Sequence, residues 1–148
     1  MLLPVAIMAQ SIASKSRHLR IENAEVSVHY PGIQGAPIMR NYTITVVLRK
    51  DLKSLPDSIF VDGFAEKLTL QGPAGEGSSL KKGSRLTFTA NVTINTAENA
   101  ENTMYSKKSG LTTDGVCVIR YYAEKKGKQQ PVYFRAKTLK KGAEVFAP

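Results

Sequence analysis

The 148-residue sequence has little of the residue types that build metal and redox sites. Cysteine occurs once, at Cys117, so no intramolecular disulfide can form, and histidine occurs only at His18 and His29. No Cys/His spacing typical of zinc and no acidic loop typical of calcium is present. We therefore expect no metal ion and no cofactor, and we interpret Cys117 as a small buried hydrophobic residue.

Tryptophan is also absent, which leaves six tyrosines and five phenylalanines as the large aromatic anchors of a core. The apolar run at residues 2–9 is far shorter than the ~20 residues that a transmembrane helix needs, so no such helix is predicted. With 42% hydrophobic and 22% charged residues, the composition is nevertheless that of a globular protein. The length suits a single domain.

Recognisable catalytic motifs are missing as well. The glycine-rich segment 72–77 lacks the Gly-Lys-Ser/Thr that completes a phosphate-binding loop, so we interpret it as a plain loop. His29 shares a strand face with Ser27 and Glu25, but side chains two residues apart stand too far from each other for a good direct hydrogen bond. We expect no enzymatic activity. The alternative is a small hydrolase whose site is assembled from residues distant in the sequence.

The first residues resemble the second half of a secretory signal peptide, because the apolar run ends at Ala9 in an Ile-x-Ala pattern. The basic stretch that opens such peptides is missing. We predict a truncated signal peptide at residues 1–9, a flexible lead-in at 10–18 and the folded domain at 19–148. Because the only cysteine is Cys117, no lipid anchor is expected. The expected location is the periplasm or the exterior, with the cytoplasm as the alternative.

What the sequence has in abundance is the period-two alternation of half-buried strands. It runs through residues 21–30, 42–48 and 86–94, with polar residues, many of them threonine, at the intervening positions. The apolar positions expected to face the core are Ala24, Val26, Val28, Tyr30, Tyr42, Ile44, Val46, Leu48, Leu86, Phe88, Ala90, Val92 and Ile94.

Glycine and proline separate these segments. Loops are predicted at residues 31–37 and 71–83, and Asp62-Gly63 predicts a tight hairpin turn between two short strands. Residues 51–56 are a connector with at most one helical turn. Residues 95–114 are polar and non-periodic, with a short helix over 97–104.

About seven alternating strands without a convincing amphipathic helix indicate an all-β protein. We predict a single antiparallel β-sandwich with an immunoglobulin-like arrangement, and a small β-barrel as the alternative. Residues 140–148 are expected to form a loosely held tail.

A long hairpin over residues 115–139 is the most strongly patterned part of the chain. Its arms are residues 116–124 and 129–139, joined by Lys125, Lys126, Gly127 and Lys128. A one-residue slip would send every side chain to the other face, so the register can be chosen from the apolar pairs. The preferred register pairs Glu124 with Gln129, Tyr121 with Val132, Ile119 with Phe134 and Cys117 with Ala136.

The opposite face of this hairpin is basic and aromatic. It carries Arg120, Tyr122, Tyr133, Arg135 and Lys137, and the lysines at 125, 126 and 128 extend its positive field. The formal charge of the chain is +9, of which +7 lies after residue 71. Arginine and aromatic residues are enriched at binding hot spots, and a positive field attracts polyanions.

These features predict an exported, non-enzymatic domain that binds a protein or an anionic polymer, such as an acidic glycan or nucleic acid, through this face. The alternative is a nucleic-acid-binding β-domain in the cytoplasm, where bases stack on the aromatic rings.

Overall fold

The computed structural model describes residues 12–32, 36–71, 80–94, 107–108 and 116–146, and every regular element among them is a β-strand. The strands are β1 (Ile12–Ala13), β2 (Leu19–Tyr30), β3 (Ile38–Leu48), β4 (Ser58–Val61), β5 (Phe64–Lys67), β6 (Thr69–Leu70), β7 (Arg85–Ile94), β8 (Lys107–Lys108), β9 (Cys117–Lys125), β10 (Lys128–Arg135) and β11 (Lys140–Phe146).

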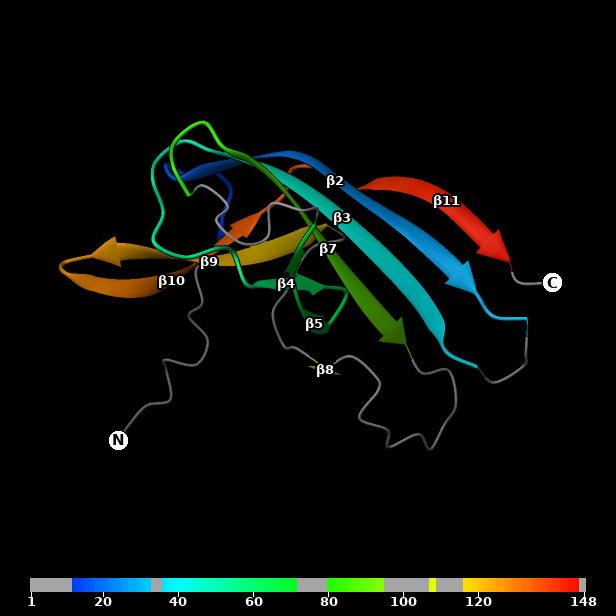
Figure 1. Ribbon diagram of the computed structural model, residues 1–148. Helices are drawn as coiled ribbons and strands as arrows, with labels where there is room; N and C mark the ends of the chain where they lie inside the picture. Colours follow the sequence, from blue (N-terminus) through cyan, green and yellow to red (C-terminus); the bar gives the residue numbers. More distant parts are fainter. Residues whose placement is uncertain (1–11, 33–35, 72–79, 95–106, 109–115, 147–148) are drawn as a thin grey trace, which may run out of the picture.

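The strands form two sheets, and neither sheet closes into a barrel (Figure 1). The six-stranded sheet has the order β1-β10-β9-β4-β5-β8, and the five-stranded sheet has the order β11-β2-β3-β7-β6. Neighbouring strands are antiparallel except at the edge pairs β1–β10 and β11–β2, which are parallel. The all-β prediction is confirmed. The barrel alternative is wrong, and the prediction that all strands are antiparallel is wrong at these two edges.

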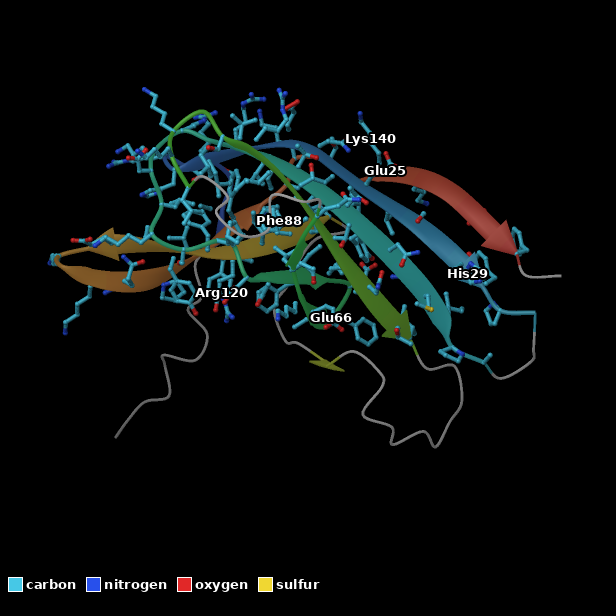
Figure 2. All side chains as sticks on the ribbon, in the orientation of Figure 1. Glu25, His29, Glu66, Phe88, Arg120 and Lys140 are labelled. Carbon is cyan, nitrogen blue, oxygen red and sulfur yellow. The ribbon has the colours of Figure 1, made fainter. Side chains whose placement is uncertain are left out.

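Side-chain alternation on both sheets builds one core, and Phe88 lies within it (Figure 2). In the five-stranded sheet the predicted inward positions of β3, those of β7 up to Val92 and the first two of β2 are buried. The six-stranded sheet contributes Ile59, Val61, Cys117, Ile119, Tyr121, Ala123 and Phe134. Burying a large apolar side chain of this kind stabilises the fold by about 1.5–3 kcal/mol. The predicted inward positions Val28, Tyr30 and Ile94 are only half-buried.

Two tight turns have the left-handed backbone that a two-residue hairpin of type I′ requires. Asp62 and Gly63 have φ values of 46° and 82°, which agrees with the turn predicted at these residues. Lys126 and Gly127, with φ values of 51° and 78°, join β9 to β10. The second turn is shorter than the four-residue connection expected, because Lys125 and Lys128 pair across the strands.

The register predicted for the long hairpin is confirmed. Glu124 pairs with Gln129, Tyr121 with Val132 and Ile119 with Phe134. The N–H of Ala136 also donates to the carbonyl of Cys117 at 2.9 Å. The second arm, however, ends at Arg135 rather than at residue 139.

Much of the segment expected to be a loose tail is strand β11, which pairs with β2 from Lys140 to Phe146. Gly142 permits this pairing, because a Cβ there would lie 2.9 Å from Glu25 Oε2 and 3.2 Å from the Val26 carbonyl oxygen. Sequence periodicity did not show this strand, since its partner lies more than a hundred residues away.

The structure also describes two further segments on which predictions were made. Residues 51–56 contain no helical turn; instead the N–H of buried Leu52 donates to the carbonyl of Leu80 at 2.7 Å. Residues 12–18, the described part of the predicted flexible lead-in, are hydrogen-bonded to the fold through β1 and Ser16. The helix predicted at 97–104 and the signal-like residues 1–9 lie outside the described residues.

Candidate functional site

The basic-aromatic face lies on the outer side of the six-stranded sheet, opposite the core. Arg120 faces Tyr133 across the hairpin, Tyr122 faces Pro131, and Arg135 faces Val118. On the other side of β9, strand β4 brings Ser58 next to Arg120. Figure 2 shows Arg120 projecting away from the core side chain Phe88. Strand alternation and pairing thus bring together four of the predicted residues, Arg120, Tyr122, Tyr133 and Arg135.

Arg120 is the centre of this face and is held in a fixed position. Its Nε donates to Asp57 Oδ1 and its Nη2 to Asp57 Oδ2, both at 3.0 Å, and Nη2 also donates to Ser58 Oγ at 3.1 Å. The backbone N–H of Asp57 donates to the Arg120 carbonyl at 3.0 Å. The pKa of Arg120 lies above its ordinary value, chiefly because of the hydrogen bonds to Asp57. Asp57 therefore offsets much of the Arg120 charge.

Aromatic rings surround the Arg120 guanidinium. Its central carbon lies 5.9 Å from the ring centre of Phe60 and 5.6 Å from that of Tyr122, within the range of cation–π attraction. Phe60 in turn meets Tyr133, with ring centres 5.6 Å apart and planes tilted by 55°. We call Asp57, Ser58, Phe60, Arg120, Tyr122 and Tyr133 the arginine–aromatic cluster.

The cluster is packed but still reaches solvent. Tyr122, Tyr133 and Phe60 are half-buried, and 27% of the Arg120 side chain is exposed. Val118, which alternation places on the same outer face, is fully buried between its neighbours Phe60 and Arg135. The tyrosines are therefore neither core residues nor freely solvated.

Sequence reasoning did not include Asp57, Ser58 and Phe60 in this face. The alternation of Ser58 and Phe60 with buried Ile59 and Val61 was the available signal that they point outward. The sequence did not predict which strand pairs with β9 on this side, because β4 and β9 are more than fifty residues apart.

The predicted lysines are not all part of this surface. Lys137 follows the end of β10 and lines a small hollow with Glu22, Asn23 and Lys140 beside β2, so the structure separates it from Tyr122 and Tyr133. Lys125, Lys126 and Lys128 are exposed at the hairpin tip. Lys125 also lines the hairpin cavity described below.

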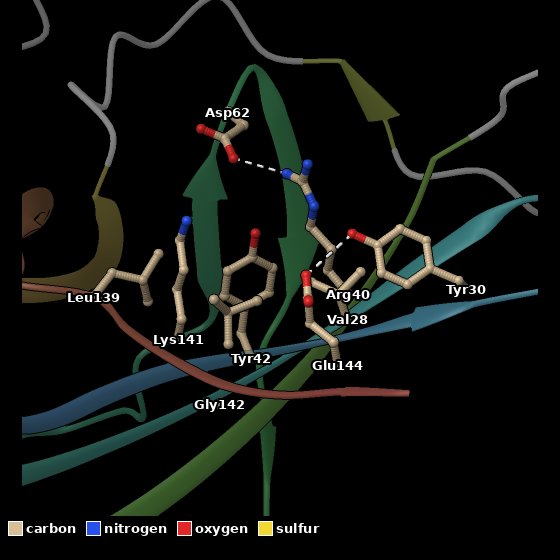
Figure 3. A pocket seen from close by; sticks show the side chains of 10 residues that line it. Val28, Tyr30, Arg40, Tyr42, Asp62, Leu139, Lys141, Gly142 and Glu144 are labelled. Atoms are coloured by element: carbon tan, nitrogen blue, oxygen red, sulfur yellow. Dashed lines mark hydrogen bonds and ion pairs between the residues drawn. The ribbon is translucent and has the colours of Figure 1, made fainter. Parts of the chain in front are cut away.

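Strand β11 covers a cavity of about 560 Å³ (Figure 3). Its apolar wall consists of Val26, Val28, Tyr42 and Leu139, and its polar wall of Tyr30, Arg40, Asp62, Lys141 and Glu144. Arg40 Nη1 donates to Asp62 Oδ2 at 2.7 Å, which links β3 to the turn between β4 and β5. The hydroxyl of Tyr30 donates to Glu144 Oε1 at 3.3 Å. Burial raises the pKa of Tyr42.

A second cavity, of about 570 Å³, lies beside the tip end of the long hairpin and is called here the hairpin cavity. Its walls are Arg17, His18, Lys50, Ala123, Glu124, Lys125, Gln130, Pro131 and Val132. Beneath it, the hydroxyl of Tyr121 lies 2.6 Å from Ser16 Oγ and 3.1 Å from His18 Nδ1. Burial raises the pKa of Tyr121. The pKa of His18 is lowered by burial and, to a lesser degree, by Lys50 and Arg17.

The remaining polar candidates are separate from these sites. Cys117 is fully buried, and burial raises its pKa to about 12, so its thiol is protonated at neutral pH. His29 is exposed near the end of β2. Within the described ranges, no three His, Cys, Asp or Glu residues lie close enough together to hold a metal ion.

The part of the chain that the structure describes contains no helix with the length and apolarity needed to cross a membrane. Comparison of the sequence and structure with protein-family models, curated proteins and solved structures finds no match.

Proposed function

We propose that this protein is an exported, non-enzymatic β-sandwich domain that binds a protein or an anionic polymer through the arginine–aromatic cluster, with Arg135 at its border. The observation that carries the proposal is the fixed Arg120 between Asp57 and two aromatic rings on the outer side of the sheet. Rigid aromatic and arginine side chains lose little conformational entropy on binding.

The order of the strands supports an immunoglobulin-like arrangement. In that fold, strands named A to G in chain order form one sheet with the order ABED and another that contains GFC. Here β2-β3-β7-β6 follows the first order, and β10-β9-β4-β5 follows the order GFCC′. One core is shared by both sheets, as in a β-sandwich. Domains of this architecture commonly present a sheet face or the end loops to a partner, but the fold alone does not imply a function.

A protein partner is favoured over a polyanion at the cluster itself. Two hydrogen bonds from Arg120 to Asp57 offset the charge that would attract a polyanion. What remains accessible is a half-buried surface of Phe60, Tyr122 and Tyr133, suited to stacking and to burial against apolar groups.

The proposal is tested by photo-crosslinking with benzoylphenylalanine in place of Tyr122, in protein produced and exported by its native host. Crosslinks to one partner are expected from this position and not from Phe146, which is a control because it is 68% exposed on the other sheet. With the purified partner, Tyr122→Ala and Tyr133→Ala should each weaken binding at least tenfold, and Lys137→Ala should have little effect. Equal crosslinking from both positions, or equal affinities, would contradict the proposal.

Asp57→Asn distinguishes the two classes of partner. The variant removes a negative charge and leaves the Arg120 guanidinium unbalanced, so a polyanion should bind more tightly and with a steeper salt dependence. A protein partner that recognises the ordered cluster should bind more weakly, because Arg120 loses its fixed position. Heparin and single-stranded DNA are suitable polyanion probes.

A further inference from the structure

The hairpin cavity shares no lining residue with the arginine–aromatic cluster, although one of its walls, Pro131, pairs with Tyr122. Ala123 and Val132 line it, and alternation directs these residues to the core side of β9 and β10. The hairpin extends to one end of the molecule, where the turn joining β9 and β10 is the most distant point (Figure 1). The cavity is therefore a separate site that does not depend on the proposed function.

Cations dominate the walls of this cavity. Arg17, Lys50 and Lys125 contribute three positive charges, and Glu124 contributes the only carboxylate among the cavity's described lining residues. Glu124 Oε1 already accepts a hydrogen bond from Lys53 Nζ at 2.5 Å, which offsets its charge. The cavity is thus electropositive, and an anionic group inside it would be attracted from several directions.

The hydrogen bonds beneath the cavity assign the protonation state of His18. Ser16 Oγ accepts the backbone N–H groups of His18 at 3.1 Å and Leu19 at 3.2 Å, so both of its lone pairs are used. Its hydroxyl proton must therefore be donated to the phenolic oxygen of Tyr121 at 2.6 Å. Tyr121 in turn donates its own proton to His18 Nδ1 at 3.1 Å. The assignment follows from counting donors and acceptors.

This chain makes His18 Nδ1 an acceptor and leaves the proton on Nε2. If Nδ1 carried the proton, Tyr121 would accept hydrogen bonds from both Ser16 and His18, and its own buried hydroxyl proton would lose its acceptor. The lowered pKa of His18, caused by burial and by Lys50 and Arg17, agrees with a neutral ring. A cavity with several cations and a fixed neutral N–H donor has the groups that bind an oxyanion.

We propose that the hairpin cavity binds an oxyanion group, a sulfate, phosphate or carboxylate, through Arg17, Lys50, Lys125 and the Nε2–H of His18. A volume of about 570 Å³ leaves room for a larger ligand that carries this group, such as an acidic sugar. Sulfate is the appropriate probe because it carries the same charge at every pH at which His18 titrates.

The test is a titration of the full chain with sodium sulfate, followed by NMR at constant ionic strength with sodium chloride as the compensating salt. Saturable shifts are expected for the amides of Lys50 and Lys125 and for the imidazole of His18, and none for His29, which is the internal control. Two-bond nitrogen–proton spectra should show His18 as the Nε2–H tautomer. Shifts that grow linearly with sulfate, or that affect both histidines equally, would overturn the proposal.

Charge-reversal variants locate the site. Lys50→Glu and Arg17→Glu should each weaken sulfate binding roughly fivefold or more, because each replaces an attraction by a repulsion. Lys67→Glu, an exposed position on β5, is the matched control and should leave the affinity unchanged. Equal losses in all three variants would mean that only the net charge matters and would contradict a defined site.

Tyr121→Phe tests the role of the hydrogen-bond chain. It removes the donor to His18 Nδ1, so the spectra should show a mixture of tautomers and sulfate should bind more weakly. Because Tyr121 is buried, the amide spectrum of the Tyr121→Phe variant is recorded first to check that the variant is folded. Ser16→Ala, which leaves that ring in place, is the second variant. An unchanged tautomer in both variants would refute the assignment.

To identify the source of the oxyanion, sulfated and carboxylated oligosaccharides are compared with free sulfate. Tighter binding of an oligosaccharide supports the larger ligand, and equal affinity contradicts it.

Discussion

Within one strand, neighbouring residues have opposite chemistry because alternate side chains face opposite environments. Cys117 points into the core, where desolvation suppresses ionisation, whereas Arg120 points outward and is held by Asp57. The burial of Cys117 was predictable from the apolar pairing of the hairpin. The partner of Arg120 was not, because Asp57 comes from a segment distant in sequence.

The raised pKa of Cys117 makes the fold sensitive to alkali. In the unfolded chain the thiol ionises near its ordinary value of about 8.5, but in the folded protein it stays protonated to about pH 12. Between these values the unfolded state binds fewer protons, so the free energy of unfolding falls as pH rises. Urea unfolding from pH 7 to 11 measures this loss.

Cys117→Ala supplies the control for that measurement. Its free energy of unfolding should fall less between pH 8.5 and 10 than that of the unchanged protein, before the buried tyrosines Tyr42 and Tyr121 add the same effect at higher pH. The native thiol should also resist a thiol reagent until the protein unfolds. Identical pH profiles for the two proteins would contradict this account.

At the scale of the strands, local patterns predicted well what depends on local geometry. The alternation on β3 and β7, the turn at Asp62-Gly63 and the register of β9 with β10 follow from neighbouring residues. The edge strands β1 and β11 were missed, because each is held by hydrogen bonds to a strand more than a hundred residues away. Neither has enough alternating apolar residues to predict a strand alone.

The close approach of β11 to β2 depends on Gly142. We expect Gly142→Ala to lower the free energy of unfolding by about 1 kcal/mol, since the new methyl group would lie 3.2 Å from the Val26 carbonyl oxygen, which cannot move without the strand. Amide hydrogen exchange in residues 140–146 should accelerate more than elsewhere. Lys140→Ala, an exposed change on the same strand, is the control; equal effects of both variants would contradict this explanation.

At the scale of the whole molecule, the sequence predicted the all-β class and one shared core, because both depend on composition and periodicity. The sequence also predicted that Arg120, Tyr122, Tyr133 and Arg135 share the outer face of the hairpin. Lys137, which was assigned to the same face, lines the hollow beside β2. The cavities were not predictable, since they arise where strands far apart in sequence meet. The contact of His18 with Tyr121 was not predictable either, because 103 residues separate the two in the sequence.

The two parallel edge pairs have a mechanical consequence. When opposite ends of the chain are pulled apart, β1 and β10 are drawn in opposite directions along their length, and so are β2 and β11. Force is then shared by all the hydrogen bonds of each pair instead of breaking them one after another. We expect the rupture force in single-molecule pulling from the chain ends to fall in Gly142→Ala and to be unchanged in Lys140→Ala. If both variants rupture at the original force, β11 does not carry the load.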